Sequence, residues 1–188
     1  SPTYAGVDLM CLHRLHTYCV TPAVREQCEA LLSVFWTDAI ANCFAPAFRL
    51  GGAHSRDYDY LGGRGIIDSW LAAAGCFADP NPNATPPLLW LQSSWRPAPA
   101  WLRELQATPR FVTQVWGPSS NEYRVMWAGK HIALSVAGKN YHNMDAPMVV
   151  NFAGPQHLPR GYFIADGRRD PYGKKVIPEG AGPHQKTL

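Results

Sequence analysis

The sequence predicts an α+β fold in which a helical N-terminal half packs on an antiparallel sheet from the C-terminal half. Apolar residues recur at helical spacing in the first half, and short apolar runs typical of strands fill much of the second. Between them, residues 79–87 contain four prolines, which excludes a helix or a central strand there. Apolar residues make up 46% of the chain and charged residues 16%, so a packed core is expected.

Three helices are expected from their caps and spacing. The longest follows Thr21-Pro22, a helix-start signal, and runs to about Cys43. A short helix fits residues 65–74, and another starts at Pro99 and ends near residue 106. The longest helix has one apolar face, formed by Val24, Cys28, Leu31, Leu32 and Phe35.

Five strands are expected in the second half. They are Leu88 to Gln92, Arg110 to Trp116, Tyr123 to Trp127, His131 to Ala137 and Met148 to Phe152. Residues 166–188 are rich in Gly, Pro, Lys and Arg, and few of them are apolar. We therefore expect one domain over residues 1–165, followed by a flexible tail.

Charge and cysteine usage narrow the classes of function. The net charge of +3 is too small to favour nucleic-acid binding. No apolar run approaches the roughly 20 residues that span a bilayer, so no membrane partner is expected. Five cysteines without a CxxC pair argue against a zinc ribbon, and we expect no cofactor. Five reduced cysteines fit a cytoplasmic protein, whereas two disulfides and one thiol would fit a secreted protein. We expect a monomer.

One cysteine lies where a nucleophile could be placed. Cys11 begins an apolar helical stretch, and Asp8 is positioned to cap it. The peptide dipoles at a helix N-terminus favour a thiolate, and the free N–H groups there, at Leu9 and Met10, can bind an oxyanion. Cys19, two residues before the longest helix, is the second candidate nucleophile.

Three segments resemble the ovarian-tumour (OTU) family of papain-like cysteine proteases. The segment Asp8-Leu9-Met10-Cys11-Leu12-His13-Arg14-Leu15 resembles the family's nucleophile motif, with Leu9 in place of its usual Gly and His13 in place of its usual aromatic residue. Gly62-Gly63, before an apolar helix, resembles a second segment. His131 opens an apolar strand late in the chain, which is the usual position of the family's general base.

The resemblance implies a deubiquitinating protease with a papain-like fold. Cys11 would attack a carbonyl as thiolate, and His131 would transfer the proton, with His142 as the rival base. Asp8 or Asp145 would orient the imidazole. A hairpin after the His131 strand would place Asp145, or else Asn143, beside the start of that strand. Cys11 and His131 would then face each other across a cleft.

The implied partner is ubiquitin or a ubiquitin-like protein, and a viral origin would add cleavage of the virus's own polyprotein in the host cytoplasm. Two alternatives remain open at this point. One is a papain-like peptidase, amidase or deamidase with no ubiquitin role. The other is a non-enzymatic binding domain stabilised by disulfides, in which Trp and Tyr side chains anchor a partner.

Overall fold

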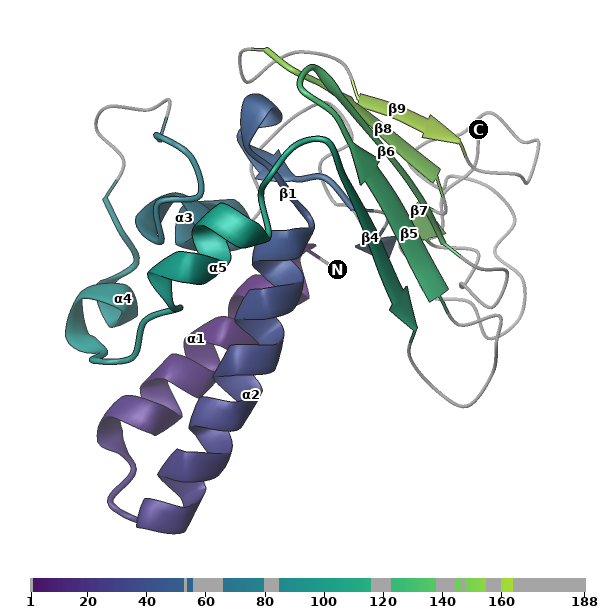
Figure 1. Ribbon diagram of the computed structural model, residues 1–188. Coiled ribbons are helices and arrows are strands. Elements are labelled where there is room, and N and C mark those ends of the chain that lie inside the picture. Colours follow the sequence, from purple (N-terminus) through teal and green to yellow (C-terminus); the bar gives the residue numbers. More distant parts are fainter. Residues whose placement is uncertain are drawn as a thin grey trace, which may run out of the picture.

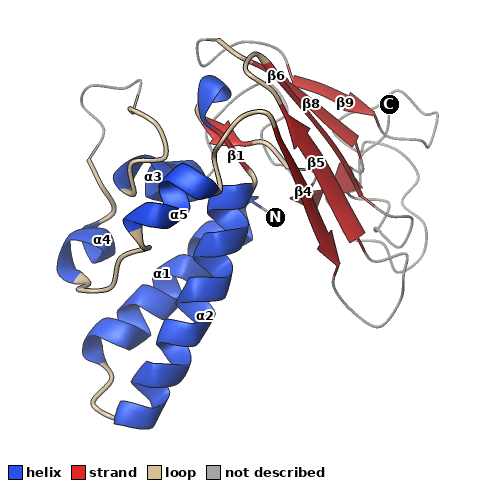
Figure 2. Ribbon diagram, in the orientation of Figure 1, coloured by secondary structure: helices blue, strands red, loops and turns tan. Residues whose placement is uncertain are grey.

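The chain is described here from a computed structural model (Figure 1). It describes residues 2–52, 54–55, 66–79, 85–115, 123–137, 145–146, 148–154 and 160–163. Helices come first and an antiparallel sheet follows, which confirms the predicted α+β order (Figure 2). Gly62-Gly63, His142, Asn143 and the predicted tail lie outside the described residues.

Five α-helices form a helical lobe in the part of the chain that the structure describes. They are α1 (Pro2–Tyr18), α2 (Pro22–Ala41), α3 (Ile66–Ala73), α4 (Leu88–Gln92) and α5 (Pro99–Glu104). Helix α1 packs against α2, α3 and α4. Helices α2, α3 and α5 confirm the three predicted ones, and prolines occupy the first turns of α2 and α5 as expected. None of the described helices is long and apolar enough to cross a bilayer.

Helix α1 begins at Pro2, so the predicted helix start at Cys11 is wrong. The reason is tertiary packing, which a short apolar pattern does not show. Gly6 lies against α3 so closely that an added Cβ would be 2.6 Å from Cγ2 of Ile66. Leu9 is fully buried on the same side of the helix. The buried stripe of α1 is therefore Gly6, Leu9, His13 and His16, at helical spacing.

The strand predicted for residues 88–92 is wrong, because this segment is the helix α4. A run of five mostly apolar residues fits the period of a helix and the period of a strand alike, so the local pattern does not decide between helix and strand. Trp90 is buried, while Leu88 and Leu91 point to solvent. Arg96 stabilises the helix end: its guanidinium donates to the carbonyl of Trp90 at 2.5 Å and lies 4.2 Å from the centre of the indole.

The main sheet has five antiparallel strands in the order β4-β5-β6-β8-β9. Its strands are β4 (Arg110–Val115), β5 (Tyr123–Ala128), β6 (Ile132–Ala137), β8 (Met148–Phe152) and β9 (Arg160–Phe163). The first four match predicted strands. Two short ladders lie beside it, namely β1 (Cys43–Phe44) with β2 (Arg49–Leu50), joined by the 3-10 turn η1 (Ala45–Ala47), and β3 (His54–Ser55) with β7 (Asp145–Ala146).

Two separate clusters of buried side chains form the core. The larger lies within the helical lobe and includes Trp36, Trp70 and Trp90. The smaller joins Phe44 and Ala47 to the inner face of the sheet, where it contacts Met126, Ala128 and Ala133. The inner face is the side of the sheet that turns toward β1, η1 and the end of α2.

Polar contacts join the last turn of α2 to the sheet. The guanidinium of Arg124 on β5 contacts the carboxylate of Asp38 at 2.5 Å. The amide of Asn42, just after α2, donates to Oε1 of Gln114 on β4 at 2.8 Å. Nε of Arg110 donates to the carbonyl of Ala41 at 3.2 Å. Among the described residues, the end of α2 therefore meets the sheet through hydrogen bonds and an ion pair.

Candidate functional site

Cys11 lies in the middle of α1 and is exposed. It borders an open groove of about 580 Å³ with five neighbours, Arg14, Leu15, Tyr18, Cys19 and Val20. All six residues come from α1 and the two positions after it, and none of them is a histidine or a carboxylate. Among the described residues, therefore, no general base or orienting acid borders the thiol on this groove.

Asp8, Leu9 and Met10, which were expected at a helix start beside Cys11, lie within a helix instead. Asp8 lies inside α1 rather than at its cap. Leu9 and Met10 also lie inside the helix, where each N–H group bonds the carbonyl four residues earlier. The free N–H donors that an oxyanion would need were expected at a helix start. The helix starts at Pro2 instead, so this expectation is wrong.

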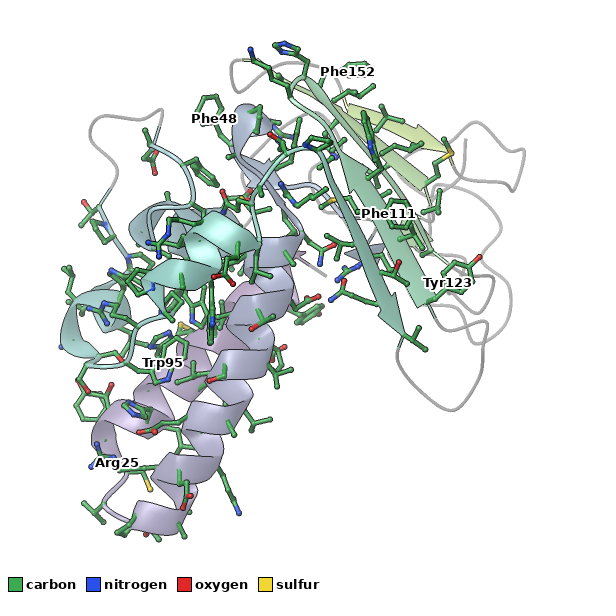
Figure 3. All side chains as sticks on the ribbon, viewed as in Figure 1. Arg25, Phe48, Trp95, Phe111, Tyr123 and Phe152 are labelled. Carbon is green, nitrogen blue, oxygen red and sulfur yellow. The ribbon has the colours of Figure 1, made fainter. Side chains whose placement is uncertain are left out.

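His131 lies at the turn between β5 and β6 and is exposed. Its carbonyl accepts a hydrogen bond from the N–H of Ala153 at 2.8 Å, which places it at the end of the sheet that carries Phe152. Figure 3 shows Phe152 at the edge of the molecule remote from α1. The structure therefore does not bring His131 to Cys11.

Asp145 also lies apart from His131. It pairs with Ser55 in the β3–β7 ladder. The next strand begins at Met148, which pairs with Val136 near the far end of β6. Val136 is five residues after His131 in the chain. Since a strand rises about 3.3 Å per residue, the position beside Val136, where β8 begins, is roughly 17 Å from His131. The predicted placement of Asp145 beside the start of the His131 strand is wrong, because the antiparallel register places Phe152 there.

A different histidine occupies the centre of the helical lobe. His13 is fully buried, with Trp36, Trp70, Trp90 and Trp95 around it. Its ring stacks on Trp70 at 4.9 Å between centroids. Its Nε2 accepts a hydrogen bond from the indole N–H of Trp36 at 3.1 Å, and its Nδ1 lies 3.0 Å from Oγ of Ser93. Figure 3 labels Trp95, which lies among the helices.

These contacts fix the protonation of His13. An indole nitrogen only donates, so Nε2 of His13 must be unprotonated and Nδ1 must donate to Ser93. Burial, with a smaller contribution from the nearby Arg96 charge, lowers the pKa of His13 from 6.5 to about 4. Because Nδ1 already carries a proton, His13 cannot take one from the Ser93 hydroxyl. The His13–Ser93 pair is therefore part of the core and not a nucleophile with its base.

His13 also shows a signal that sequence reasoning missed. It stands where the OTU motif has an aromatic residue, and in the structure it fills an aromatic position among tryptophans. His16, three residues later, is buried too, with Nε2 at 3.0 Å from Oε1 of Glu29. Counting the two histidines as buried residues would have extended the helical period of α1 through residues 6, 9, 13 and 16.

No protein-family model matches this sequence, and comparison with curated proteins and with solved structures finds no match. Within the described ranges, no group of three or more His, Cys, Asp or Glu side chains could hold a metal ion. The five cysteines, all of which are described, are free thiols.

The most unusual surface is the outer face of the sheet, the side turned away from the helical lobe. Phe111 and Val115 are 68% and 67% exposed, and Trp127 is 41% exposed. Cross-strand pairing aligns Phe111, Trp127, Leu134 and Val150 in one row. The outer-face positions of β4, β5, β6 and β8 are Phe111, Thr113, Val115, Tyr123, Val125, Trp127, Ile132, Leu134, Val136, Met148, Val150 and Phe152.

None of these outer-face residues is charged. The inner face is the more polar one, since it carries Arg110, Gln114, Arg124, Ser135 and Asn151 among its apolar residues. A sheet with one solvated face ordinarily shows the opposite arrangement, with polar residues outward. Contiguous exposed apolar surface of more than a few hundred Å² marks interaction sites. The outer face is therefore the strongest candidate functional surface among the described residues.

Proposed function

We propose that this chain is a protein-interaction module that assembles with a second copy of itself through the outer sheet face. The observation that carries the proposal is the row of apolar side chains across four strands, three of them exposed (Phe111, Trp127 and Leu134), with no charged residue on the same face. Covering such a face removes apolar surface from water, which is the main driving force of protein association. This proposal replaces the monomer expected from the sequence.

The chemistry of the outer face favours a second copy as its partner. A partner with charged groups would have to bury them against a surface that offers no counter-charge, which is costly. An identical face carries no such groups. Two antiparallel sheets pack face to face about 10 Å apart with their strands roughly aligned. A two-fold axis near Trp127 and Leu134 would bury the same patch on both copies, as closed dimers require.

A matched pair of valines tests the proposal. Val115 on β4 and Val34 on α2 are 67% and 65% exposed, but only Val115 belongs to the outer face. Sedimentation equilibrium should show a monomer–dimer equilibrium for the unchanged chain. We expect Val115→Lys to weaken dimerisation at least about ten-fold and Trp127→Lys, nearer the centre, to abolish it. Val34→Lys should leave it unchanged.

Either of two results would overturn this proposal. One is an unchanged chain that stays monomeric up to the highest soluble concentration. The other is a Val34→Lys variant that loses as much affinity as Val115→Lys. Circular dichroism of each variant must first show an unchanged fold, so that loss of dimer reports on the surface itself.

A second candidate function, the OTU-like cysteine hydrolase with a papain-like fold, is favoured by one observation. Cys11 presents an exposed thiol on a groove large enough to receive a peptide or an acyl chain. Ubiquitin or a ubiquitin-like tail would be the substrate, and the free state of all five thiols supports a cytoplasmic location. Since the structure does not bring His131 to Cys11, the proposal needs another base, and a His142→Ala variant tests the rival histidine, which lies outside the described residues.

The hydrolase proposal has a direct test. A ubiquitin carrying a C-terminal electrophile should label the protein once, and peptide mapping should place the label on Cys11. Cys19 borders the same groove, so Cys19→Ala is the matched control and should still be labelled. No labelling would exclude a deubiquitinase. Labelling that persists in Cys11→Ala would exclude Cys11 as the nucleophile.

A further inference from the structure

The groove beside Cys11 combines apolar side chains with a positive charge. Of the described residues that line it, Arg14 is charged, and the others are apolar, aromatic or thiol side chains. Leu15, Tyr18 and Val20 are 46%, 58% and 92% exposed. Figure 1 shows the end of α1, with the turn to α2, at the end of the molecule remote from the sheet. The groove is therefore a surface separate from the outer face.

The spacing of the lining residues places them along one side of α1. Leu15 follows Cys11 by four residues and Tyr18 follows Leu15 by three, so the three side chains form a row. At 1.5 Å per residue, the row from Cys11 to Tyr18 is roughly 10 Å long. Arg14, three residues after Cys11, belongs to the same side of the helix. Its charge therefore lies near the middle of the row.

Two sets of contacts hold the Tyr18 end of the groove in place. The hydroxyl of Tyr18 donates to Oε1 of Gln92, at the end of α4, at 3.1 Å. The N–H of Cys19 donates to the carbonyl of Leu15 at 2.8 Å, and its thiol donates to the carbonyl of Thr21 at 3.9 Å. This end of the groove is thus formed before any ligand binds, as is usual for small-molecule sites.

The charge of Arg14 is accessible to a ligand. Arg14 is exposed, and within the described part of the chain no ion pair holds its guanidinium. None of the described residues that line the groove carries a negative charge. A guanidinium presents its N–H donors in a planar fork that matches the two oxygens of a carboxylate. A ligand complementary to this groove therefore has an anionic end and an apolar body.

We propose that this groove binds an anionic amphiphile of the long-chain carboxylate class, such as a fatty acid. The carboxylate bonds the guanidinium of Arg14, and the alkyl chain covers Leu15, Tyr18 and Val20. The groove volume of about 580 Å³ lies in the range typical of small-molecule sites. Binding removes apolar surface of both partners from water. The inference rests neither on the dimer nor on hydrolysis, because it uses no outer-face residue and no reaction of Cys11.

Two thiols on the groove report whether it is occupied. Cys11 and Cys19 line the groove, whereas the other three cysteines are buried. N-ethylmaleimide should therefore label Cys11 and Cys19 first in the unchanged chain. Dodecanoate is added below its micelle concentration, and calorimetry gives its Kd. At ten times that Kd, labelling of Cys11 should slow about ten-fold, because the bound ligand covers the thiol.

A second amphiphile and two pairs of variants separate charge from apolar contact. Dodecyltrimethylammonium has the same chain with the opposite charge, and it should bind at least about ten-fold more weakly than dodecanoate. Arg14→Gln should raise the Kd of dodecanoate about ten-fold, whereas Arg103→Gln, at an exposed arginine of α5, should leave it unchanged. Leu15→Asp adds a negative charge to the groove and should abolish binding. Leu31→Asp is its control, because Leu15 and Leu31 are 46% and 47% exposed and Leu31 does not line the groove.

Several outcomes count against the proposal. It fails if dodecanoate neither binds by calorimetry nor protects Cys11, or if dodecyltrimethylammonium binds equally well. It also fails if Leu31→Asp loses as much affinity as Leu15→Asp. Vesicles of phosphatidylglycerol test a membrane as the source of the anionic amphiphile, and binding to vesicles without binding to monomeric dodecanoate would contradict a fatty-acid site. Titration of the unchanged chain with the two amphiphiles decides the matter even if a variant fails to fold.

Discussion

The helical lobe and the five-stranded sheet direct their large aromatic side chains in opposite ways. In the lobe, Trp36, Trp70 and Trp90 point inward around His13 and are almost completely buried. In the sheet, Phe111 and Trp127 point outward and remain exposed. The sheet buries smaller or more polar residues on its inner face instead. The comparison shows that the lobe buries its large aromatic side chains in its own core, while the sheet leaves such side chains exposed on its outer face.

The largest expected effect tests the two tryptophan environments against each other. Trp70→Ala should lower the free energy of unfolding by about 3 to 5 kcal/mol, because it opens a cavity beside the His13 ring. Trp127→Ala, at a position 41% exposed, should cost about 1 kcal/mol at dilution. Urea unfolding of both variants measures the difference. Equal losses of free energy of unfolding would show that Trp127 stabilises the monomer as much as Trp70 does.

The pH dependence of the free energy of unfolding tests how well the lobe shields His13 from water. The pKa of His13 is about 4 in the folded chain and near 6.5 when unfolded. Between these values the unfolded state binds more protons, so stability is full above pH 6.5 and is lost as pH falls toward 4. The loss at this residue should approach about 3 kcal/mol.

His13→Phe provides the comparison for that titration. This variant keeps an aromatic ring against Trp70 but has no titrating group, so its stability should change less between pH 6.5 and 4 than that of the unchanged chain. Subtracting the two urea-unfolding curves at each pH removes the contribution of carboxylates. Identical pH dependence would show that His13 is protonated as readily in the folded chain as in water.

The smallest expected effect concerns the junction between lobe and sheet. Asp38→Asn removes the carboxylate that contacts Arg124 but keeps a side chain able to bond Gln114. Asp38 is half exposed, so solvent weakens the pair and the loss should be about 1 kcal/mol or less. A double-mutant cycle with Arg124→Gln isolates the pair energy. A coupling energy of zero would show that the Asp38–Arg124 ion pair does not contribute to holding the two parts together.

The sequence allowed the elements with strong local signals to be predicted. Thr21-Pro22 and Pro99 marked helix starts, and the runs at β4, β5, β6 and β8 were long enough to indicate strands. The start of α1 depended on a contact with α3, and α4 on a run too short to show its period. Neither is visible in a local pattern, because the deciding atoms lie elsewhere in the chain.

The candidate site was less predictable than the fold. The expected triad combined a histidine and an aspartate by counting residues along a hairpin, but the pairing of Ile132 with Phe152 decides what lies beside His131. The outer face was missed for a related reason. Strands that are apolar on both sides are typical of a sheet covered on both faces. Only the register, which aligns Phe111 with Trp127 and Leu134, shows that large apolar side chains on one side stay exposed among the described residues.

Gly6 has a consequence for how the lobe can vary. Its Cα lies so near α3 that an added Cβ would be 2.8 Å from the backbone nitrogen of Ile67, and a backbone atom cannot rotate out of the way. Any other amino acid there would act as a wedge between the two helices. His13, two turns further along α1, stacks on Trp70 of α3. A side chain at residue 6 would move the two helices apart and so open space between the His13 and Trp70 rings. The absence of one methyl group thus sets the spacing at which the aromatic core closes.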